Sequence, residues 1–402
     1  MPLILPGNVG SATAGGFNVA NSLRFNSGSS DYLNKTNGTP TNNDICTISL
    51  WTKLSTIGTD TGLFSEHTDG NNRFQFSNPT AGYLSLLQKN SGTTQISIAT
   101  NRVFRDPSAW YHIVLAIDTT NGTAANRVKL YINGVQETSF QTETYPDQNT
   151  DIRFNSDGLD QEIGRVTASD YFGGYMSEIV FIDGQQLAPT SFGEFDEDSG
   201  IWKPIDVSGL TFGNNGFYLD YKDSANLGND ANGGTDFTEG GLTAIDQTTD
   251  TPTNNFATLN PLTNSEMTFS EGNTKTVRGG TNGQFATSTF EVNKGKWYFE
   301  SKLLNYSGDS RPTIGLSQSH KSFASVLAGA SNNKVYYLLE SSTYQSNSAT
   351  AITVDSSPAT NDIYMWGIDL DNLKFYIGKN GTWLHSSDPS AGSNGLAIQV
   401  SD

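Results

Sequence analysis

The close spacing of short apolar runs constrains this chain more than any other feature. Residues 110–118 (WYHIVLAID) are almost continuously apolar, as in a strand covered on both faces. Residues 127–135 (RVKLYINGV) carry apolar side chains at every second position and contain Asn133-Gly134, a strong hairpin-turn signal. Similar runs recur between residues 22 and 221, separated by turns rich in Gly, Asn and Ser. This pattern predicts an all-β fold of the sandwich or jelly-roll type.

The length of the chain predicts more than one domain. A chain of 402 residues corresponds to two or three domains of ordinary size. We expect two antiparallel β-sandwich domains joined by an Asn/Gly/Thr-rich linker. The expected boundaries are an N-terminal arm (1–20), a first jelly roll (21–240), the linker (241–267) and a second sandwich (268–402).

Charge and cysteine content narrow the class of protein. The 41 acidic and 23 basic side chains give a net charge of −18, which argues against a nucleic-acid partner. The single cysteine, Cys46, lies in an apolar run, so we expect a buried thiol and assembly in a reducing cytoplasm. The first 16 residues lack a basic segment and a long apolar stretch, so neither a signal peptide nor membrane insertion is expected.

Four segments of the first domain resemble the laminin-G or concanavalin A-like jelly roll. They are residues 48–53 (ISLWTK), 110–115 (WYHIVL), 128–134 (VKLYING) and 173–181 (GGYMSEIVF). Each is a weak match alone, but their order and spacing match the family over roughly residues 17–240. The resemblance implies a lectin-like fold in this part of the chain.

The second domain is similar to SPRY domains. Residues 297–300 (WYFE), 314–316 (IGL), 365–371 (MWGIDLD), 374–376 (KFY) and 379–381 (KNG) carry this resemblance. The strands that usually follow the last hairpin are missing before residue 402, so this sandwich is expected to be incomplete at its end.

The two resemblances together are similar to structural proteins of marine bacteriophages. They imply a virion protein, a tail or head fibre, that displays lectin-like domains for attachment to a host-surface glycan or receptor. The alternatives are a capsid-decorating or cement protein that binds other virion proteins, and a glycan depolymerase. The position on a particle stays open.

The sequence predicts no catalytic residue. Jelly-roll glycosidases place two carboxylates on one strand face, and the nearest pattern here is residues 194–198 (EFDED). These residues follow the last core strand and lack the closing glutamate, so we interpret them as a solvated acidic turn. The four histidines form no pair with the spacing of metal ligands, and no phosphate loop or nucleophile elbow is present. We therefore predict a protein that is not an enzyme.

Loop aromatics beside amides and acids are the candidate ligand-binding residues. A sugar ring stacks on an aromatic face while carboxylates and amides bind its hydroxyls. The strongest candidates are Asp170 and Tyr171, and weaker ones are Tyr344 and Trp383.

No cofactor is expected, apart from calcium on the jelly-roll rim. Carboxylate and amide oxygens in loops are the ligands that calcium prefers. The candidate ligands are Asp60, Asp69, Asn71 and Asp157, and no spacing resembles an EF-hand loop.

The apolar triplet Leu3, Ile4 and Leu5 is the predicted assembly element. Exposed aliphatic side chains favour burial, either against another chain or against the protein's own first domain. We favour a homo-oligomer, with three-fold symmetry implied by the fibre resemblance. Five aromatic residues within strand patterns are expected to be buried: Trp51, Trp110, Tyr131, Trp297 and Trp366.

Overall fold

A computed structural model describes residues 16–78, 81–264, 266–279, 284–306, 313–317, 334–338, 343–346, 352–354 and 358–398. These residues form two compact units. The N-terminal unit extends to Leu262 and includes Phe269–Val277, and the C-terminal unit includes Thr263–Thr268 and the described residues from Arg278 onward. Helices in the described part are single 3-10 turns only, and the named strand pairs are antiparallel. The predicted all-β, jelly-roll class is therefore confirmed.

Sheet A of the N-terminal unit has eight strands around a fully buried central strand, β13 (Gly174–Asp183). One path through the sheet runs β10 (Val135–Gln136), β9 (Val128–Ile132), β8 (Trp110–Asp118), β3 (Ile45–Leu54), β13, β1 (Ser22–Phe25) and β18 (Gln247–Thr248), and β16 (Phe217–Leu219) also pairs with β13. The turn between β9 and β10 is Asn133-Gly134, and both residues have positive φ, as a type I′ hairpin requires.

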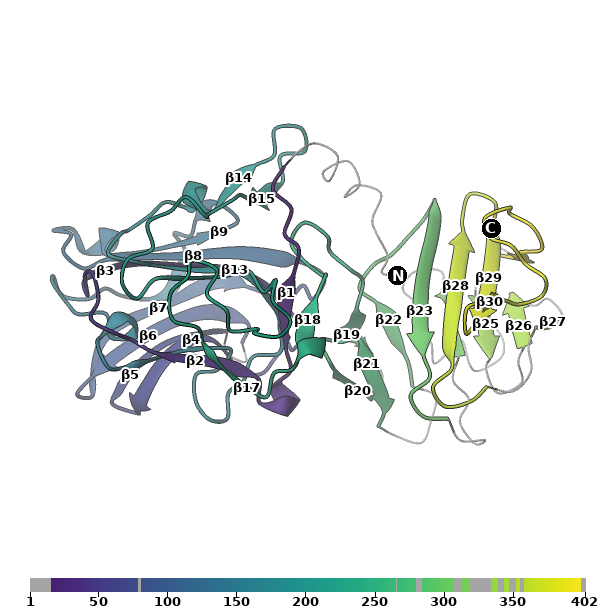
Figure 1. The fold of residues 1–402 in the computed structure, drawn as a ribbon, viewed down its shortest axis with the longest axis horizontal. Helices are drawn as coiled ribbons and strands as arrows, with labels where there is room; N and C mark the ends of the chain where they lie inside the picture. The colour runs from purple at the N-terminus through teal and green to yellow at the C-terminus, as the bar shows by residue number, and fades with distance from the viewer. Residues whose placement is uncertain are drawn as a thin grey trace. The chain divides into compact units, whose positions relative to one another are not determined.

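Sheet B is the second layer of this unit. Its order is β11 (Phe140–Thr144), β7 (Thr93–Val103), β6 (Tyr83–Asn90), β5 (Asn72–Asn78), β4 (Thr61–Asp69), β12 (Asp160–Ile163), β2 (Tyr32–Thr36) and β17 (Thr238–Gly240). Figure 1 shows β3, β8, β9 and β13 in one layer and β2 and β4–β7 in the other. Apolar side chains alternate along β5 and β6 and point toward sheet A, which leaves the other face of sheet B polar.

The main core lies between the two sheets and centres on Phe154. This residue belongs to one of five 3-10 turns: η1 (Ser27–Ser29), η2 (Ala124–Asn126), η3 (Arg153–Asn155), η4 (Pro189–Ser191) and η5 (Ala244–Asp246). The Phe154 ring contacts Phe64, Phe74 and Phe181 at centroid distances of 5.7, 5.3 and 5.4 Å. A turn inserted between the sheets therefore joins them through aromatic contacts.

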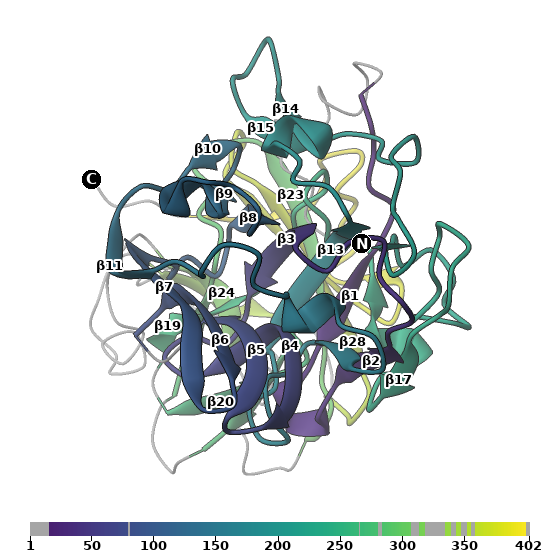
Figure 2. The same ribbon diagram turned by 90° about the vertical axis from the view of Figure 1, so that its left-hand side faces the viewer.

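A second, smaller core covers the outer face of sheet A. Val114 and Val180 point away from the main core and pack beneath Phe192, Val207 and Phe212, from the chain that follows β13. That chain includes the hairpin β14 (Gly193–Phe195) and β15 (Trp202–Pro204), which Figure 2 shows at the rim of the unit. Burial of β8 on both faces confirms the interpretation of residues 110–118.

Polar residues on this covered face are paired internally. His112 accepts a hydrogen bond from Trp202 Nε1 at its Nδ1 (2.9 Å), so its Nε2 carries the proton and donates to Ser49 Oγ (2.9 Å). The His112 ring also stacks on Trp51 and Trp202. Burial lowers the pKa of His112 to about 3, because nothing there compensates a charged ring.

A β-bulge in β13 places a carboxyl group on the same face. The register against β3 shifts between Ser177 and Val180, and Glu178 adopts a φ of 48°. Tyr218 donates from its hydroxyl to Glu178 Oε2 (2.6 Å). Burial raises the pKa of Glu178 to about 7.

The described part of the C-terminal unit contains two antiparallel sheets. The first contains β23 (Lys296–Lys302), β28 (Ile363–Asp369), β29 (Lys374–Lys379), β30 (Thr382–Trp383) and β31 (Leu396–Ala397). The second contains β24 (Thr313–Ser317), β25 (Lys334–Leu338), β26 (Thr343–Ser346) and β27 (Ile352–Thr353). Two more pairs, β19 (Leu259–Asn264) with β22 (Ala286–Ser288) and β20 (Met267–Ser270) with β21 (Lys275–Arg278), lie between residues 259 and 288.

The structure differs from the sequence interpretation in two respects. Trp51, Trp297 and Trp366 are buried, but Trp110 and Tyr131 are only half-buried. Both face the outer side of sheet A, where Trp110 is the first residue of β8 and Tyr131 lies on β9, next to the edge strand β10. Much of the segment interpreted as a linker, 241–267, folds onto the N-terminal unit: β18 pairs with β1, and Asp250 is buried. Its polar composition reflects hydrogen bonding to the covered face of sheet A.

We expect His112 to make the protein less stable as the pH falls. Unfolded histidine titrates near 6.5 and the folded side chain near 3, so the unfolded state binds more protons in this window. The contribution of His112 to the free energy of unfolding is therefore complete above pH 6.5. It is lost as pH falls toward 3, by up to about 1.4 kcal/mol per pH unit. Free energies of unfolding in urea, measured at several pH values, should fall less steeply for His112→Phe than for wild type.

Phe is the matched replacement because it keeps a ring between Trp51 and Trp202 without titrating. Glu178 titrates with the opposite sign, since its raised pKa stabilises the fold at low pH, but it does so in both proteins. If the free energy of unfolding fell equally with pH in wild type and in His112→Phe, His112 would not be the group responsible.

Candidate functional site

The predicted residues Asp170 and Tyr171 lie in a short turn beside the end of β12. Tyr171 forms an isolated antiparallel bridge with Arg165, and Val166 donates its N–H to the Asp170 carbonyl (3.2 Å). Thr167 Oγ1 donates to the Asp170 carboxylate (2.8 Å). The turn therefore holds both predicted side chains in place at the outer face of sheet B.

Arg165 is the centre of this region and was not predicted from the sequence. Its guanidinium carbon lies 3.5 Å from the centroid of the Tyr32 ring, and it forms an ion pair with Glu162. The Tyr171 ring lies 6.3 Å from that of Tyr32 at an angle of 50°. We call Tyr32, Glu162, Arg165, Asp170 and Tyr171 the Arg165 cluster. It offers two half-buried aromatic rings beside charged hydrogen-bonding groups.

Glu162 is held as an acceptor. Besides the pair with Arg165, it accepts from Ser65 Oγ (3.3 Å) and from Asn34 Nδ2 (3.4 Å). Its side chain is 12% exposed and that of Arg165 is 18% exposed. A carboxylate engaged in this way orients the guanidinium and is not free to act as a general acid.

A polar row extends from the cluster across sheet B. Cross-strand registers place Asn34, Glu162, Ser65, Gln75 and Leu87 next to one another in this order. Directly opposed residues of neighbouring strands have Cβ atoms about 4.5–5.5 Å apart. The row therefore forms a continuous polar surface, interrupted by one leucine, that begins at the Arg165 cluster.

The next row on the same face carries the positive charges of Arg73 and Lys89 beside His67, and we call it the cationic row. His67 lies opposite Arg73, and Arg73 lies opposite Lys89, on β4, β5 and β6. Within the described part of the chain, Arg73 Nε is buried without a hydrogen-bond partner. The nearby Asp69 carboxylate accepts from Asn71 N and Asn72 N within its own turn. Adjacent positive charges repel one another, and an anion bound beside them would relieve that repulsion. The cationic row therefore favours an anionic ligand.

The other predicted aromatics lie in the C-terminal unit. Tyr344 is 2% exposed, donates to the Ala397 carbonyl (2.6 Å) and stacks on Phe375, so it belongs to a core and offers no ring face to a ligand. Trp383 is half-buried, with its ring edge-on to Tyr298 at 6.2 Å.

The predicted calcium ligands do not form one group. Asp69 and Asn71 share the β4–β5 turn, where backbone and side-chain donors hold the pKa of Asp69 below its usual range. Asp157 accepts from Thr39 Oγ1 (3.3 Å), and Asp60 precedes β4. No group of three His, Cys, Asp or Glu side chains suited to a metal ion occurs among the residues with described positions.

The acidic run 194–198 forms the β14–β15 hairpin. Asp196 accepts from Ser199 and from Lys203 Nζ (3.1 Å), and these bonds hold its pKa below the usual range. The carboxylate therefore stabilises a turn, as predicted. Leu3, Ile4 and Leu5 lie outside the described residues.

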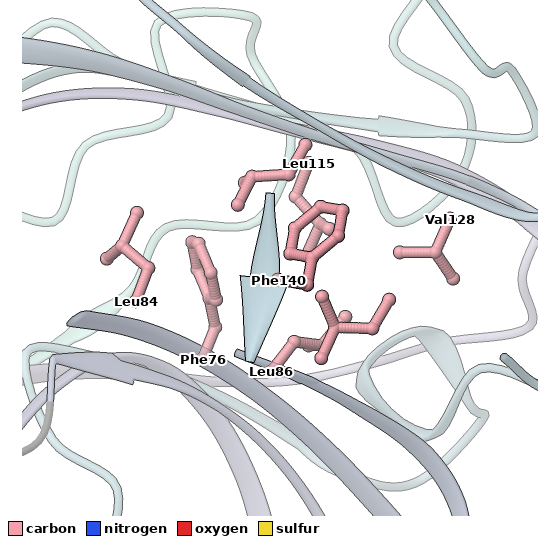
Figure 3. A pocket seen from close by; sticks show the side chains of 8 residues that line it. Phe76, Leu84, Leu86, Leu115, Val128 and Phe140 are labelled. Carbon is pink, nitrogen blue, oxygen red and sulfur yellow. The ribbon is translucent and has the colours of Figure 1, made fainter. Parts of the chain in front are cut away.

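One small cavity lies inside the jelly roll. It has a volume of about 10 Å³ and is enclosed by apolar side chains from both sheets. Figure 3 shows Leu115 approaching it from one layer and Phe76, Leu84 and Leu86 from the other. A space of this size and polarity is a packing defect, because an ordered water needs several polar partners. In the described N-terminal unit, the candidate site is thus the outer surface of sheet B.

No helix in the described ranges combines the length and apolarity needed to span a bilayer.

Residues 27–186 match the family model of the concanavalin A-like lectin/glucanases superfamily. That match and the two-sheet architecture define the N-terminal unit as a concanavalin A-like jelly-roll domain with a lectin-like fold. The comparison with curated proteins found no match.

Several solved structures are similar to part of the chain. A candidate carbohydrate-binding protein from Bacteroides ovatus is 16% identical, with 58% of this chain and 60% of that chain covered and a TM-score of 0.40. A pentraxin from Limulus polyphemus is 17% identical, with 43% and 80% covered and a TM-score of 0.31. A tailspike of an Escherichia coli O157:H7 bacteriophage is 15% identical, with 48% and 25% covered and a TM-score of 0.31.

We expect Arg165 and Glu162 to be coupled energetically. Replacing Arg165 with Met leaves a largely buried carboxylate without its counter-ion and should lower the free energy of unfolding by about 1–3 kcal/mol. The double variant with Glu162→Met should recover part of this loss, since neither charge remains. A double-mutant cycle in urea measures the coupling, and additive effects of the two changes would contradict it.

Proposed function

We propose that this protein binds carbohydrate without cleaving it, and that the ligand lies on the outer face of sheet B at the Arg165 cluster. The observation that carries the proposal is the set of half-buried rings, Tyr32 and Tyr171, beside Arg165 and two carboxylates. A sugar ring can stack on a tyrosine face while the charged groups bind its hydroxyls.

The charge of this face supports an acidic glycan as the ligand. The whole chain has a net charge of −18, yet His67, Arg73 and Lys89 lie side by side on sheet B. A carboxylate or sulfate on a sugar would supply a counter-charge for Arg73 and Lys89. The polar row between the cationic row and the Arg165 cluster gives an extended ligand further hydrogen-bonding partners.

We further propose that the protein is a virion component that presents this domain to the host surface. The support is the resemblance of both domains to structural proteins of marine bacteriophages. In this role it would contact other virion proteins and form a homo-oligomer, with residues 1–20 as the assembly arm. Imaging that locates the chain on a particle tests this role separately from glycan binding.

The depolymerase alternative has less support. Glu162 is engaged by Arg165, Ser65 and Asn34, and Asp196 is bound within its own turn. Neither carboxylate is free in the way that a glycosidase acid and nucleophile require.

Binding to an array of bacterial surface polysaccharides should depend on Tyr171. Tyr171→Ala removes a stacking face and should lower affinity about tenfold or more for the bound glycan, which corresponds to about 1.4 kcal/mol. Tyr171→Phe should retain most of the affinity because it keeps the ring. Tyr306→Ala, in the C-terminal unit, is the control and should bind like wild type. Loss of binding in the control alone would place the site in the other unit.

Charge selectivity should depend on Arg73. Arg73→Met should weaken binding of acidic glycans more than binding of neutral ones, and raised salt should weaken the wild type in the same selective way. Glycans incubated with wild type, or with the Glu194→Ala/Asp196→Ala variant, should release no new reducing ends. If Arg73→Met lost affinity equally for neutral and acidic glycans, the proposal of an acidic ligand would be contradicted.

A further inference from the structure

A buried lysine on the opposite face of the jelly roll forms an unusual group. Lys53 lies at the end of β3 on the outer face of sheet A, between Trp110 of β8 and Tyr175 of β13 in the cross-strand register. Its side chain is 1% exposed. The segment after β18 covers Lys53 and supplies the groups that contact its amine.

Three oxygen atoms surround the Lys53 amine. Nζ lies 2.8 Å from Asp250 Oδ2, 2.8 Å from Asn255 Oδ1 and 2.7 Å from the Phe256 carbonyl oxygen. The amine thus contacts a carboxylate and a side-chain amide at the same time. The Asn255 amide is fixed in orientation, since its Nδ2 donates to the Ser108 carbonyl (2.7 Å) while its oxygen faces Lys53.

Aromatic rings lie beside this group. Lys53 Nζ lies 5.8 Å from the centroid of the Tyr175 ring, and the Trp110 ring lies 6.4 Å from that of Tyr175. Trp110 Nε1 donates to Asp250 Oδ1 (3.0 Å), which leaves Oδ2 directed at the amine. Desolvation by burial lowers the pKa of Lys53, against the opposing effect of Asp250. Burial of this kind disfavours the charged form of the Lys53 amine.

We propose that Lys53 and Asn255 become joined by an isopeptide bond, with Asp250 carrying the proton. Asp250 takes a proton from the Lys53 ammonium, and the resulting neutral amine attacks Cγ of Asn255. The new N–C bond forms as the Cγ–Nδ2 bond breaks. Asp250 returns the proton to Nδ2, which leaves as ammonia, and the excess proton of the attacking nitrogen passes to Asp250. The bond needs no oxidant, cofactor or second protein.

The position of the bond gives it a mechanical consequence. It joins residues 202 positions apart in the sequence. It would tie the segment that precedes the C-terminal unit to a central strand of the jelly roll, so a force applied through the chain would meet a covalent link. Lys35 is the natural comparison, because this second buried lysine contacts the Asn215 carbonyl and two aromatic rings but no side-chain amide among the described residues.

Intact mass of the purified full chain tests the proposal. The wild type should be lighter than its sequence predicts by one ammonia, about 17 Da. Digestion with trypsin should give one branched peptide that contains both Lys53 and Asn255, with no cleavage after Lys53. The variants Lys53→Arg, Asn255→Ala and Asp250→Ala should each have the full mass expected from sequence.

Lys35→Arg is the matched control and should keep the 17 Da deficit, because among the residues with described positions no side-chain amide contacts that lysine. The wild-type measurement stands alone if a variant fails to fold. A wild-type mass equal to that of the sequence, or a loss of water with a link between Lys53 and Asp250, would overturn the proposal.

Discussion

Coverage of sheet A on both faces is the constraint on which the rest of this structure depends. β13 is buried along its whole length, with the main core on one side and the layer of Phe192, Val207 and Phe212 on the other. A strand in this position cannot expose polar groups to water, so each of them needs a partner inside the protein. His112, Glu178 and Lys53 are buried on this face. His112 and Lys53 are bound by side chains from the segments that cover it, and Glu178 is bound by Tyr218 of β16 in the same sheet.

Because sheet A is covered on both faces, the outer faces of the two sheets have different roles. Side chains on the covered outer face of sheet A bind one another and stabilise the fold. There the contacts of Lys53 hold residues 250–256 in place. The outer face of sheet B keeps partly exposed polar and charged side chains, including Arg165 and Arg73. Within the N-terminal unit, this second face therefore offers groups that a ligand can bind. The proposed glycan site follows from this asymmetry.

The sequence predicted strands well where their pattern is local. The continuous apolar run of β8 and the alternation of β9 before Asn133-Gly134 gave the correct elements, because burial and turn chemistry act within a few residues. It did not predict that Trp110 would face the Lys53 cluster, since that depends on a segment 140 positions away. The Asn- and Thr-rich stretch looked like a linker because its hydrogen-bonding partners are distant in the sequence.

The candidate site was predicted only in part for the same reason. Asp170 and Tyr171 were identified as a loop aromatic beside an acid, but Tyr32 comes from a strand far earlier in the chain. The Glu162–Arg165 pair, three residues apart, was a local signal that could have been recognised. Tyr344 was interpreted as a loop aromatic too, but it lies in β26 and is buried, because its cover by Phe375 and Ala397 comes from residues distant in the sequence.

Hydrogen–deuterium exchange with a bound acidic oligosaccharide tests the location of the glycan site most directly. The account predicts slower exchange in the turn between Arg165 and Tyr171 and along β5, with little change in the segments that cover sheet A. Protection confined to those covering segments, or to the C-terminal unit, would contradict it.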